Sequence, residues 1–335
     1  MLNKFSLDPT TFSASSAGPE LASEVSSKAD LLVAILLCTY NGERFLAEQL
    51  NSLEAQTYQN WVLIVSDDGS KDATVDILLR YQAKWPQGKI TIRNGPQKGF
   101  CQNFLSLACD PQIQAGYFAF CDQDDVWLPE KLTVALQTIA ANQNIYVPFV
   151  YCGRTTYVTE QLKPCGISPL FVFPPSFRNA LVQSIAGGNT MVFNLAAKLL
   201  IEKAGPLNIP SHDWWVYQLI SGAEGDVFYD PVPYLLYRQH DGALVGGNNS
   251  FSAKVERVMM LWQGRFQDWN TQNIDALKEV KHLLVKNHQE ILKIFEALRG
   301  AKLKDRFRLM EICGLYRQTR RGTLSLLLAA LIKKI

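Results

Sequence analysis

Several large protein classes are excluded by what this 335-residue chain lacks. Its seven cysteines include no CxxC pair and lie mostly in apolar or strand-like surroundings, so we expect buried free thiols in a reducing compartment. A disulfide framework and a cysteine-ligated zinc site are therefore disfavoured. No apolar run reaches the ~20 residues that a membrane-spanning helix needs, the longest candidate being "LSLLLAALI" at 324–332.

The usual phosphate-binding and nucleophile motifs are missing too. Neither GxxxxGKS/T nor GxGxxG occurs, and the glycine pairs at 187–188 and 246–247 are isolated. A P-loop ATPase or a classical dinucleotide-binding site is therefore not expected. The absence of a GxSxG elbow argues against the obvious nucleophile triads.

The first thirty residues differ from the rest of the chain. They are rich in Ser, Ala and Thr and lack the basic start and apolar core of a signal peptide, so we expect a mobile leader and a cytosolic body. The predicted division is a leader at 1–30, an α/β domain at 31–250 and a helical, basic extension at 251–335.

Buried strands alternate with helices through the first half of the chain. The apolar runs at 31–40, 61–70, 89–94 and 116–125 are typical of buried strands, and each is followed by a segment with helical spacing, at 41–56, 73–84, 99–109 and 127–141. This rhythm predicts a doubly wound, mostly parallel sheet. The second half is less regular, with a helix expected at 211–224, a proline-broken strand at 226–240 and helix from Phe251 onward.

Polar residues gather where the predicted strands end. Ligands of such sheets bind beyond the carboxyl ends of the strands, so a site is expected there. The residues at these ends are Thr39, Asn41, Asp67, Asp68, Asp122, Asp124 and Asp125.

Two of these strand ends are acidic turns. "DQDD" at 122–125 fits either a solvated turn or a divalent cation that gathers the carboxylates, since Mg²⁺ and Mn²⁺ prefer oxygen ligands. "SDDGS" at 66–70 fits either a tight Asp-Gly turn or a carboxylate that binds a base or ribose. Tyr40 would offer its ring to the base in the second case.

Two later segments also allow two interpretations. In "HDWW" at 212–215, Asp213 is either a helix cap beside core tryptophans or a general base beside a sugar-binding wall of Trp214 and Trp215. In "YRQHDG" at 237–242, His240 is either structural or a metal ligand, and Arg238 is a candidate phosphate contact.

Taken together, these motifs resemble a known family. "LLCTYNGERFLAEQLNSLEAQTYQNWVLIVSDDGSKDAT", "GFCQNF", "FCDQDDVW", "HDWW" and "YRQH" resemble, in that order, the family 2 inverting glycosyltransferases with the GT-A fold. The last two motifs look most like the rhamnosyltransferase branch, which builds bacterial surface polysaccharides. The resemblance covers about residues 31–250. It implies metal-dependent transfer of L-rhamnose from dTDP-rhamnose to a lipid-linked oligosaccharide.

The resemblance also implies a role for individual residues. A Mg²⁺ or Mn²⁺ ion would be bound by Asp124 and completed by His240, with Asp125 orienting the ligands. Asp213 would be the catalytic base. One departure is that Asp241 stands between His240 and Gly242, where the branch commonly has glycine directly. The nucleotide would be held by Thr39, Tyr40, Asn41, Asp67, Asp68 and Asp122, and the turn before the acceptor region would be Gly187, Gly188 and Asn189.

The last 35 residues are strongly basic. Residues 301–335 carry nine Lys and Arg against Asp305 and Glu311, a net charge of +7, whereas the rest of the chain is at −5. Such a segment either packs on its own domain or lies on an anionic membrane surface, and we expect the second, with the enzyme peripheral on the inner face of the cell membrane. No nucleic-acid recognition motif accompanies the charge.

Three other functions are alternatives to rhamnosyl transfer. A UDP-hexose donor would keep the fold and the mechanism. A nucleotidyltransferase would carry a Gly-rich, basic loop after the first strand, whereas "CTYNGERF" has one glycine. An inactive assembly partner would be marked by loss of Asp124 or Asp213, and both are present. The sequence leaves the acceptor, the linkage and a homodimer open.

Overall fold

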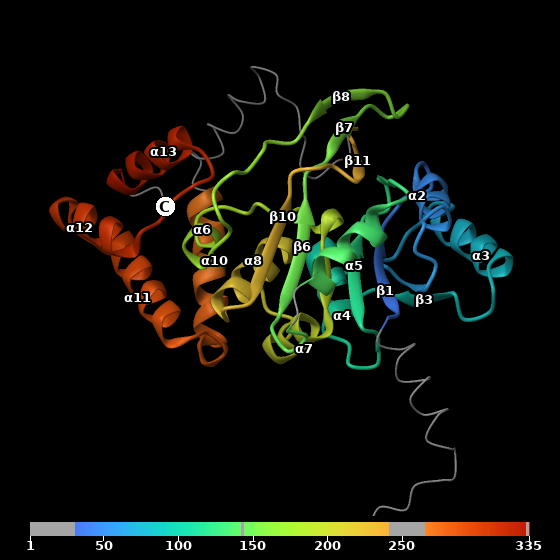
Figure 1. Ribbon diagram of the computed structural model, residues 1–335, viewed down its shortest axis with the longest axis horizontal. Coiled ribbons are helices and arrows are strands. Elements are labelled where there is room, and N and C mark those ends of the chain that lie inside the picture. Colours follow the sequence, from blue (N-terminus) through green and yellow to red (C-terminus); the bar gives the residue numbers. More distant parts are fainter. Residues whose placement is uncertain (1–30, 142–143, 241–264, 333–334) are drawn as a thin grey trace, which may run out of the picture.

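The computed structural model describes residues 31–141, 144–240, 265–332 and 335. The predicted leader at 1–30, the loop that begins at Asp241 and the expected helix start at Phe251 lie outside these residues. A central sheet stands between two layers of helices, with a small second sheet at one end and a group of C-terminal helices at one side (Figure 1).

The central sheet is mostly parallel, as the sequence predicted. Among the described strands of this sheet, only β9 runs against its neighbours, and it pairs antiparallel with both β4 and β6. The seven strands in spatial order are β10 (Asp226–Asp230), β6 (Phe149–Gly153), β9 (Val192–Asn194), β4 (Tyr117–Cys121), β1 (Val33–Thr39), β2 (Trp61–Asp67) and β3 (Ile90–Asn94).

The second sheet is small and was not expected from the sequence. It has the order β5 (Val126–Trp127), β11 (Leu235–Arg238), β7 (Thr156–Val158) and β8 (Pro164–Ile167). In Figure 1, β6 and β10 lead upward into β7 and β11, so this sheet lies beyond the carboxyl ends of the central strands.

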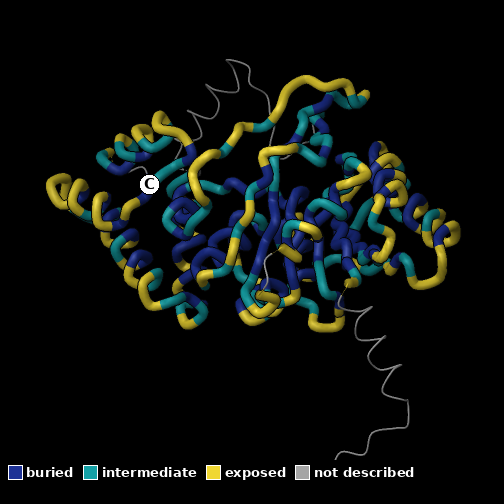
Figure 2. The backbone as a smooth tube through the Cα atoms, viewed as in Figure 1, coloured by how far each residue is buried: buried dark blue, intermediate teal, exposed yellow. Residues whose placement is uncertain are grey.

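Alternate residues of β1 pack into two hydrophobic layers, because successive side chains of a strand point to opposite faces. Ala34 and Leu36 pack on one side, and Ile35 and Leu37 pack on the other. Figure 2 shows the buried strands at the centre of the molecule and exposed segments around them. The first side is covered by α4 (Phe100–Ala108), α7 (Leu195–Ala204) and α8 (His212–Gly222), and the second by α2 (Leu46–Glu54), α3 (Thr74–Lys84) and α5 (Lys131–Ala141).

The helix predicted at 127–141 starts later than expected. Trp127 belongs to β5, where it pairs with Leu235, and α5 begins at Lys131. Pro129 also disfavours helical backbone at the preceding residue, so the chain stays extended until it has passed the proline.

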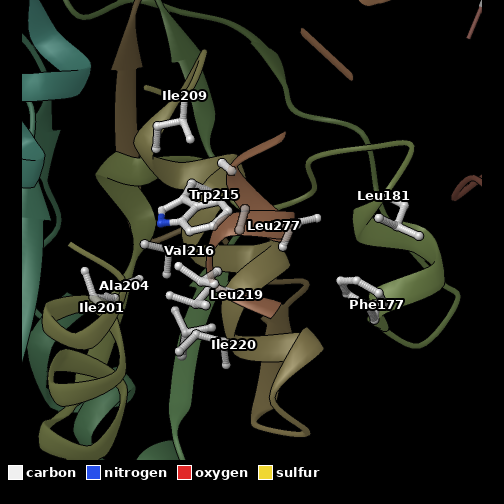
Figure 3. Close-up of a cluster of buried hydrophobic side chains, with 14 of the residues drawn as sticks. Phe177, Leu181, Ile201, Ala204, Ile209, Trp215, Val216, Leu219, Ile220 and Leu277 are labelled. Atoms are coloured by element: carbon white, nitrogen blue, oxygen red, sulfur yellow. The ribbon is translucent and has the colours of Figure 1, made fainter. Parts of the chain in front are cut away.

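The C-terminal helices extend one of the two hydrophobic layers. Leu277 of α10 packs in the same cluster as Trp215 of α8 (Figure 3). The predicted division of the chain at residue 250 falls outside the described residues and stays a prediction. A short α6 (Phe177–Ala180) lies beside α8. The C-terminal helices are α10 (Arg265–Glu279), η2 (Lys281–Leu283), α11 (Lys286–Gly300), α12 (Leu303–Cys313) and α13 (Arg320–Leu331).

Two expectations based on missing patterns can be compared with the structure. All seven cysteines are free thiols, five of them buried and only Cys165 exposed. Within the described residues, no helix combines the length and the apolar character needed to cross a bilayer.

Candidate active site

The topology places the two acidic turns on either side of the end of β1. Thr39 pairs with Asp67 of β2, and Leu37 pairs with Cys121 of β4. The turns that follow β2 and β4 therefore flank the residues after Thr39. This is the carboxyl edge at which the sequence predicted a site.

The turn after β2 is closed by its own hydrogen bonds. Asp67 accepts from the Thr39 hydroxyl at 2.8 Å and from the hydroxyl and amide of Ser70 at 2.6 and 2.9 Å. Asp68 accepts from the amides of Gln97 at 2.6 Å and Gly99 at 2.9 Å. Both carboxylates are buried. Their charges are thus largely compensated by the surrounding loops.

The segment after β1 is fastened to both turns. The amide of Asn41 donates to the Ser70 hydroxyl at 2.9 Å. Gln123 bonds both backbone groups of Tyr40, through Oε1 to the amide at 2.9 Å and through Nε2 to the carbonyl at 3.0 Å. A Cβ at Gly42 would overlap the Gln123 amide, so a larger residue here would displace the group that bonds Tyr40. The Tyr40 side chain itself is 56% exposed at this edge.

The turn after β4 brings together residues that are far apart in the sequence. Asp124 Oδ2 lies 3.0 Å from Nε2 of His240, the two being 116 positions apart. Asp125 is fully buried and accepts from Asn189 Nδ2 at 2.6 Å and from the amide of Arg238 at 3.1 Å. Asp125 therefore anchors the turn from inside, while Asp124 and His240 stand next to each other.

This second turn holds an excess of negative charge. Burial, together with the charges of Asp124 and Asp213, raises the pKa of Asp122 to about 8. Burial and the two neighbouring carboxylates also raise the pKa of Asp125. The charge of Lys131 acts in the opposite direction and lowers the pKa of Asp122. The Lys131 ammonium lies 3.4 Å from the centre of the Trp127 ring. No motif in the sequence points to Lys131.

A short 3-10 helix, η1 (Gly188–Thr190), joins Asp213 to the acidic turn. The amide of Gly188 donates to Asp213 Oδ2 at 3.2 Å, and the next residue, Asn189, holds Asp125. A Cβ at Gly188 would lie 2.5 Å from Nε2 of the buried His212, so only glycine fits here without a shift. Two successive residues thus fix the spacing between Asp213 and the turn.

Comparison with known proteins agrees with this arrangement. The family model "Glycosyl transferase family 2" matches residues 34–193. An uncharacterized glycosyltransferase of Rickettsia prowazekii is 34% identical over 278 residues, which cover 78% of this chain and 80% of that protein. The chain belongs to glycosyltransferase family 2. The predictions of the family and of a transferase enzyme are thereby confirmed.

Further relatives of this family 2 glycosyltransferase are named in more detail. The dTDP-rhamnosyl transferase RfbG of Shigella flexneri is 28% identical over 259 residues, covering 72% of this chain and 85% of that protein. Among solved structures, S. aureus TarS 1-349 in complex with UDP aligns with a TM-score of 0.51 at 15% identity, over 91% of this chain and 80% of that one. Mannosyltransferase PcManGT of Pyrobaculum calidifontis gives 0.50 at 14% identity, over 90% and 85%. These similarities confirm the GT-A fold.

Two predicted supporting groups of the glycosyltransferase are placed differently from expectation. Trp214 and Trp215 are 5% and 0% exposed, and the Trp214 indole donates to the Ala180 carbonyl at 2.7 Å. They cannot form a sugar-binding wall, because α8 is buried around nearly its whole circumference. Figure 3 shows Trp215 inside the core.

Arg238 is not the predicted phosphate contact either. Its side chain is buried and donates through Nε to the Asp124 carbonyl at 2.8 Å. It also forms an ion pair with Glu48 at 2.5 Å and a hydrogen bond to the Glu160 carbonyl. With its donors used in this way, the guanidinium holds the acidic turn in place instead of facing a ligand.

The residues at the second turn fit a hard divalent cation. A carboxylate oxygen of Asp124 and an imidazole nitrogen of His240 are adjacent, and Asp122 adds to the negative potential. Across the part of the chain that the structure describes, no group of three or more His, Cys, Asp or Glu side chains is placed to hold a metal ion. Mg²⁺ and Mn²⁺ usually take one or two carboxylates from the protein and complete their shell with substrate phosphates and water.

Proposed function

We propose that this enzyme is an inverting, metal-dependent transferase that moves L-rhamnose from dTDP-rhamnose to a hydroxyl of a lipid-linked oligosaccharide. The main observation in favour is the η1 connection: Gly188 holds Asp213 and Asn189 holds Asp125, so a base and an acidic turn are kept at a fixed spacing. The dTDP-rhamnose donor is favoured by the similarity to the Shigella protein of that name and by the motifs HDWW and YRQH.

Asp213 would take the proton of the acceptor hydroxyl as its oxygen attacks the anomeric carbon. The hydrogen bonds from the Gly188 amide and from the Ser211 hydroxyl orient the carboxylate of Asp213. Within the described residues, this carboxylate forms no ion pair. One displacement with a single base inverts the anomeric centre and needs no covalent intermediate. The departing group is then a nucleoside diphosphate on the side of the acidic turn.

Asp124 and His240 would hold Mg²⁺ or Mn²⁺, with Asp122 beside them. When bound, the cation stabilises the charge that develops on the leaving diphosphate. The mannosyltransferase PcManGT, which shares the fold, is described in complex with GDP-Man and Mn²⁺, and this supports a divalent metal here. The raised pKa of Asp122 fits a turn whose charge balance is completed by a cation.

The nucleoside would lie over the segment after β1. The exposed Tyr40 ring offers a face for stacking a base, and Asn41 stands beside it in a left-handed conformation with φ 48°. Asp67 and Asp68 shape this side through the loops that they bind, with Thr39 between β1 and β2. A lipid-linked acceptor would require the enzyme to work at the cytoplasmic face of the cell membrane.

A UDP-hexose donor is the second candidate. An Escherichia coli relative, 29% identical over 165 residues, is named UDP-Glc:alpha-D-GlcNAc-diphosphoundecaprenol beta-1,3-glucosyltransferase. Its name gives both a different donor and a lipid-linked acceptor. Family membership sets the nucleotidyltransferase alternative aside.

The test is release of nucleoside diphosphate from a panel of nucleotide sugars, with a lipid-linked acceptor fraction and either Mn²⁺, Mg²⁺ or EDTA. We expect release from dTDP-rhamnose, loss of release with EDTA, and a reduction of about 10²–10⁴-fold in Asp213→Asn. Asp76→Asn, an exposed carboxylate of α3, is the matched control and should behave as the parent. Release from a UDP-sugar alone would contradict the proposed dTDP-rhamnose donor. Full activity in EDTA would contradict the proposed metal dependence.

A further inference from the structure

The last helix carries an apolar stripe that faces solvent. Leu324, Leu328 and Ile332 are spaced four residues apart and are 58%, 56% and 61% exposed. This spacing puts them on one side of a helix. On α12, Leu303 and Phe307 repeat the pattern at 59% and 56% exposed. Figure 2 shows the exposed outer turns of both helices. Large apolar groups that gather on a surface usually mark a binding face.

A cavity of about 630 Å³ adjoins the stripe of α13. Its apolar lining includes Phe173, Tyr316, Leu327 and Leu324, and Leu324 also belongs to the stripe. The loop on its far side is clamped in place, because Gln318 accepts from the Phe173 amide and donates to the Phe173 carbonyl, both at 2.9 Å. The cavity is thus an apolar space that opens next to an exposed apolar helix face.

Two arginines complete the lining of this cavity. Arg317 and Arg320 border it, and neither guanidinium makes a hydrogen bond or ion pair to another described residue. Burial lowers the pKa of Arg317, because the charged form loses hydration at this position. A phosphate group would supply an anion beside this charge.

The remaining basic residues divide into structural and available ones. Arg306 is buried and donates to the carbonyls of Ala330 at 3.1 Å and Leu331 at 2.7 Å, so it caps the end of α13. In contrast, the exposed residues form no ion pair within the described structure, and they surround the apolar stripes; they are Lys302, Lys304, Arg308, Arg320 and Arg321.

We propose that α12, α13 and this cavity form a docking surface for an anionic phospholipid bilayer. The stripes of Leu303–Phe307 and Leu324–Ile332 enter the interface, the exposed basic residues face the headgroups, and the cavity takes a lipid whose phosphate lies at Arg317 and Arg320. The combination of an apolar face and surrounding positive charge is what an interfacial helix needs. A second copy of this chain would instead bring like charges together.

The proposed docking surface lies toward the same side of the molecule as the carboxyl ends of the central strands. In Figure 1, α13 is at the upper side, toward which β6 and β10 lead and where the small second sheet stands. A bilayer there would adjoin the carboxyl edge of the sheet. The presentation of a lipid-linked acceptor to Asp213 rests on the proposed function, whereas the docking itself does not.

The experiment is flotation of the full-length protein with vesicles of phosphatidylcholine alone or of phosphatidylcholine mixed with phosphatidylglycerol. We expect binding to the anionic vesicles only, weakened by salt. Leu328→Asp should reduce partitioning by at least about tenfold, and Arg320→Gln and Arg321→Gln by about fivefold each. Leu199→Asp is the matched control, since Leu199 is a leucine of α7 that is 47% exposed.

Each outcome decides one question. No flotation with anionic vesicles, or flotation that Leu328→Asp leaves unchanged, would overturn the docking surface. Loss of a dimer in sedimentation of Leu328→Asp, with no vesicle binding by the parent, would assign the face to a second copy instead. Binding of dTDP by calorimetry is expected to be unchanged in these variants, which shows that they fold. If the parent protein binds anionic vesicles but does not bind dTDP, the result would count against the proposed function and not against the docking surface.

Discussion

Two acidic turns flank the end of β1, and they differ in how their charges are compensated. In the turn after β2, Asp67 and Asp68 are surrounded by hydroxyl and amide donors. In the turn after β4, Asp122 has a strongly raised pKa and Asp124 has a histidine as its neighbour. The first turn therefore stabilises the fold with its charges, whereas the second keeps a surplus that a cation can neutralise.

The difference shows that acidic residues at equivalent strand ends can lie in opposite electrostatic surroundings. A carboxylate that accepts several backbone amides gains stability from its charge, since charge-assisted hydrogen bonds are stronger than neutral ones. A group of carboxylates without enough donors loses stability until a ligand arrives. Exchanging one acid of each turn for its amide should therefore have opposite consequences.

The largest expected effect is at Asp124. Asp124→Asn removes a candidate metal carboxylate and should lower nucleoside diphosphate release by at least about 100-fold, because a metal contributes several kcal/mol to the transition state. The free energy of unfolding without metal should not fall. Activity is measured against Mn²⁺ concentration and stability by urea denaturation. If Asp124→Asn unfolds more easily than the parent and is still activated by Mn²⁺, the two turns do not differ in function as predicted.

Asp68→Asn should show the opposite behaviour. The amide cannot accept well from both Gln97 and Gly99, so unfolding should become easier by about 1.5–3 kcal/mol. The Mn²⁺ concentration that gives half-maximal activity should stay the same. Urea denaturation beside the control Asp76→Asn checks the first point, and a metal titration checks the second.

The third prediction concerns pH and Asp122. Its pKa is about 8 in the folded protein, above the value of an unfolded Asp, so its contribution to stability is present at low pH and is lost as pH rises toward 8. Asp122→Asn lacks this loss. The midpoint of thermal unfolding without metal should therefore rise relative to the parent between pH 5 and pH 9, by a few degrees. Equal pH profiles for the two proteins would contradict the prediction.

The smallest effect is expected at Thr39. Thr39→Val keeps the shape but removes the hydroxyl that donates to Asp67, which retains its bonds from Ser70. The expected loss of stability is about 0.5–1.5 kcal/mol. Urea denaturation detects it, and a loss as large as that of Asp68→Asn would mean that the first turn depends on one bond.

The sequence predicted the strands that are long and buried on both faces. The runs that become β1, β2 and β4 end in polar residues in both the prediction and the structure. The second sheet was missed although β11 lies within the strand predicted at 226–240. Its partners β5 and β8 have only two and four residues, too few for a periodic pattern. The pairing of Trp127 with Leu235 joins segments more than a hundred positions apart. No local pattern announces such a pairing.

The structure brings several of the predicted site residues to one edge of the sheet, but the hydrogen bonds that connect them were not predicted. That Asp124 and His240 become neighbours was inferred from a family resemblance. The donors that distinguish the two turns are mostly backbone amides, such as those of Gln97, Gly99 and Arg238, and amides have no residue signature. The tryptophans of α8 were misplaced because a helix buried on all sides shows no polar face.

Arg238 has a consequence for the order in which the protein matures on the ribosome. Its amide satisfies Asp125, and its side chain bonds the Asp124 carbonyl, across 113 and 114 positions of sequence. A nascent chain that has not reached β11 therefore contains all the acids of the turn but lacks the group that shapes it. Contacts of such long range close late in folding. Binding of the proposed metal ion is accordingly expected only after residue 238 has left the exit tunnel, and a truncated translation product would contain the acidic turn without the proposed ion site.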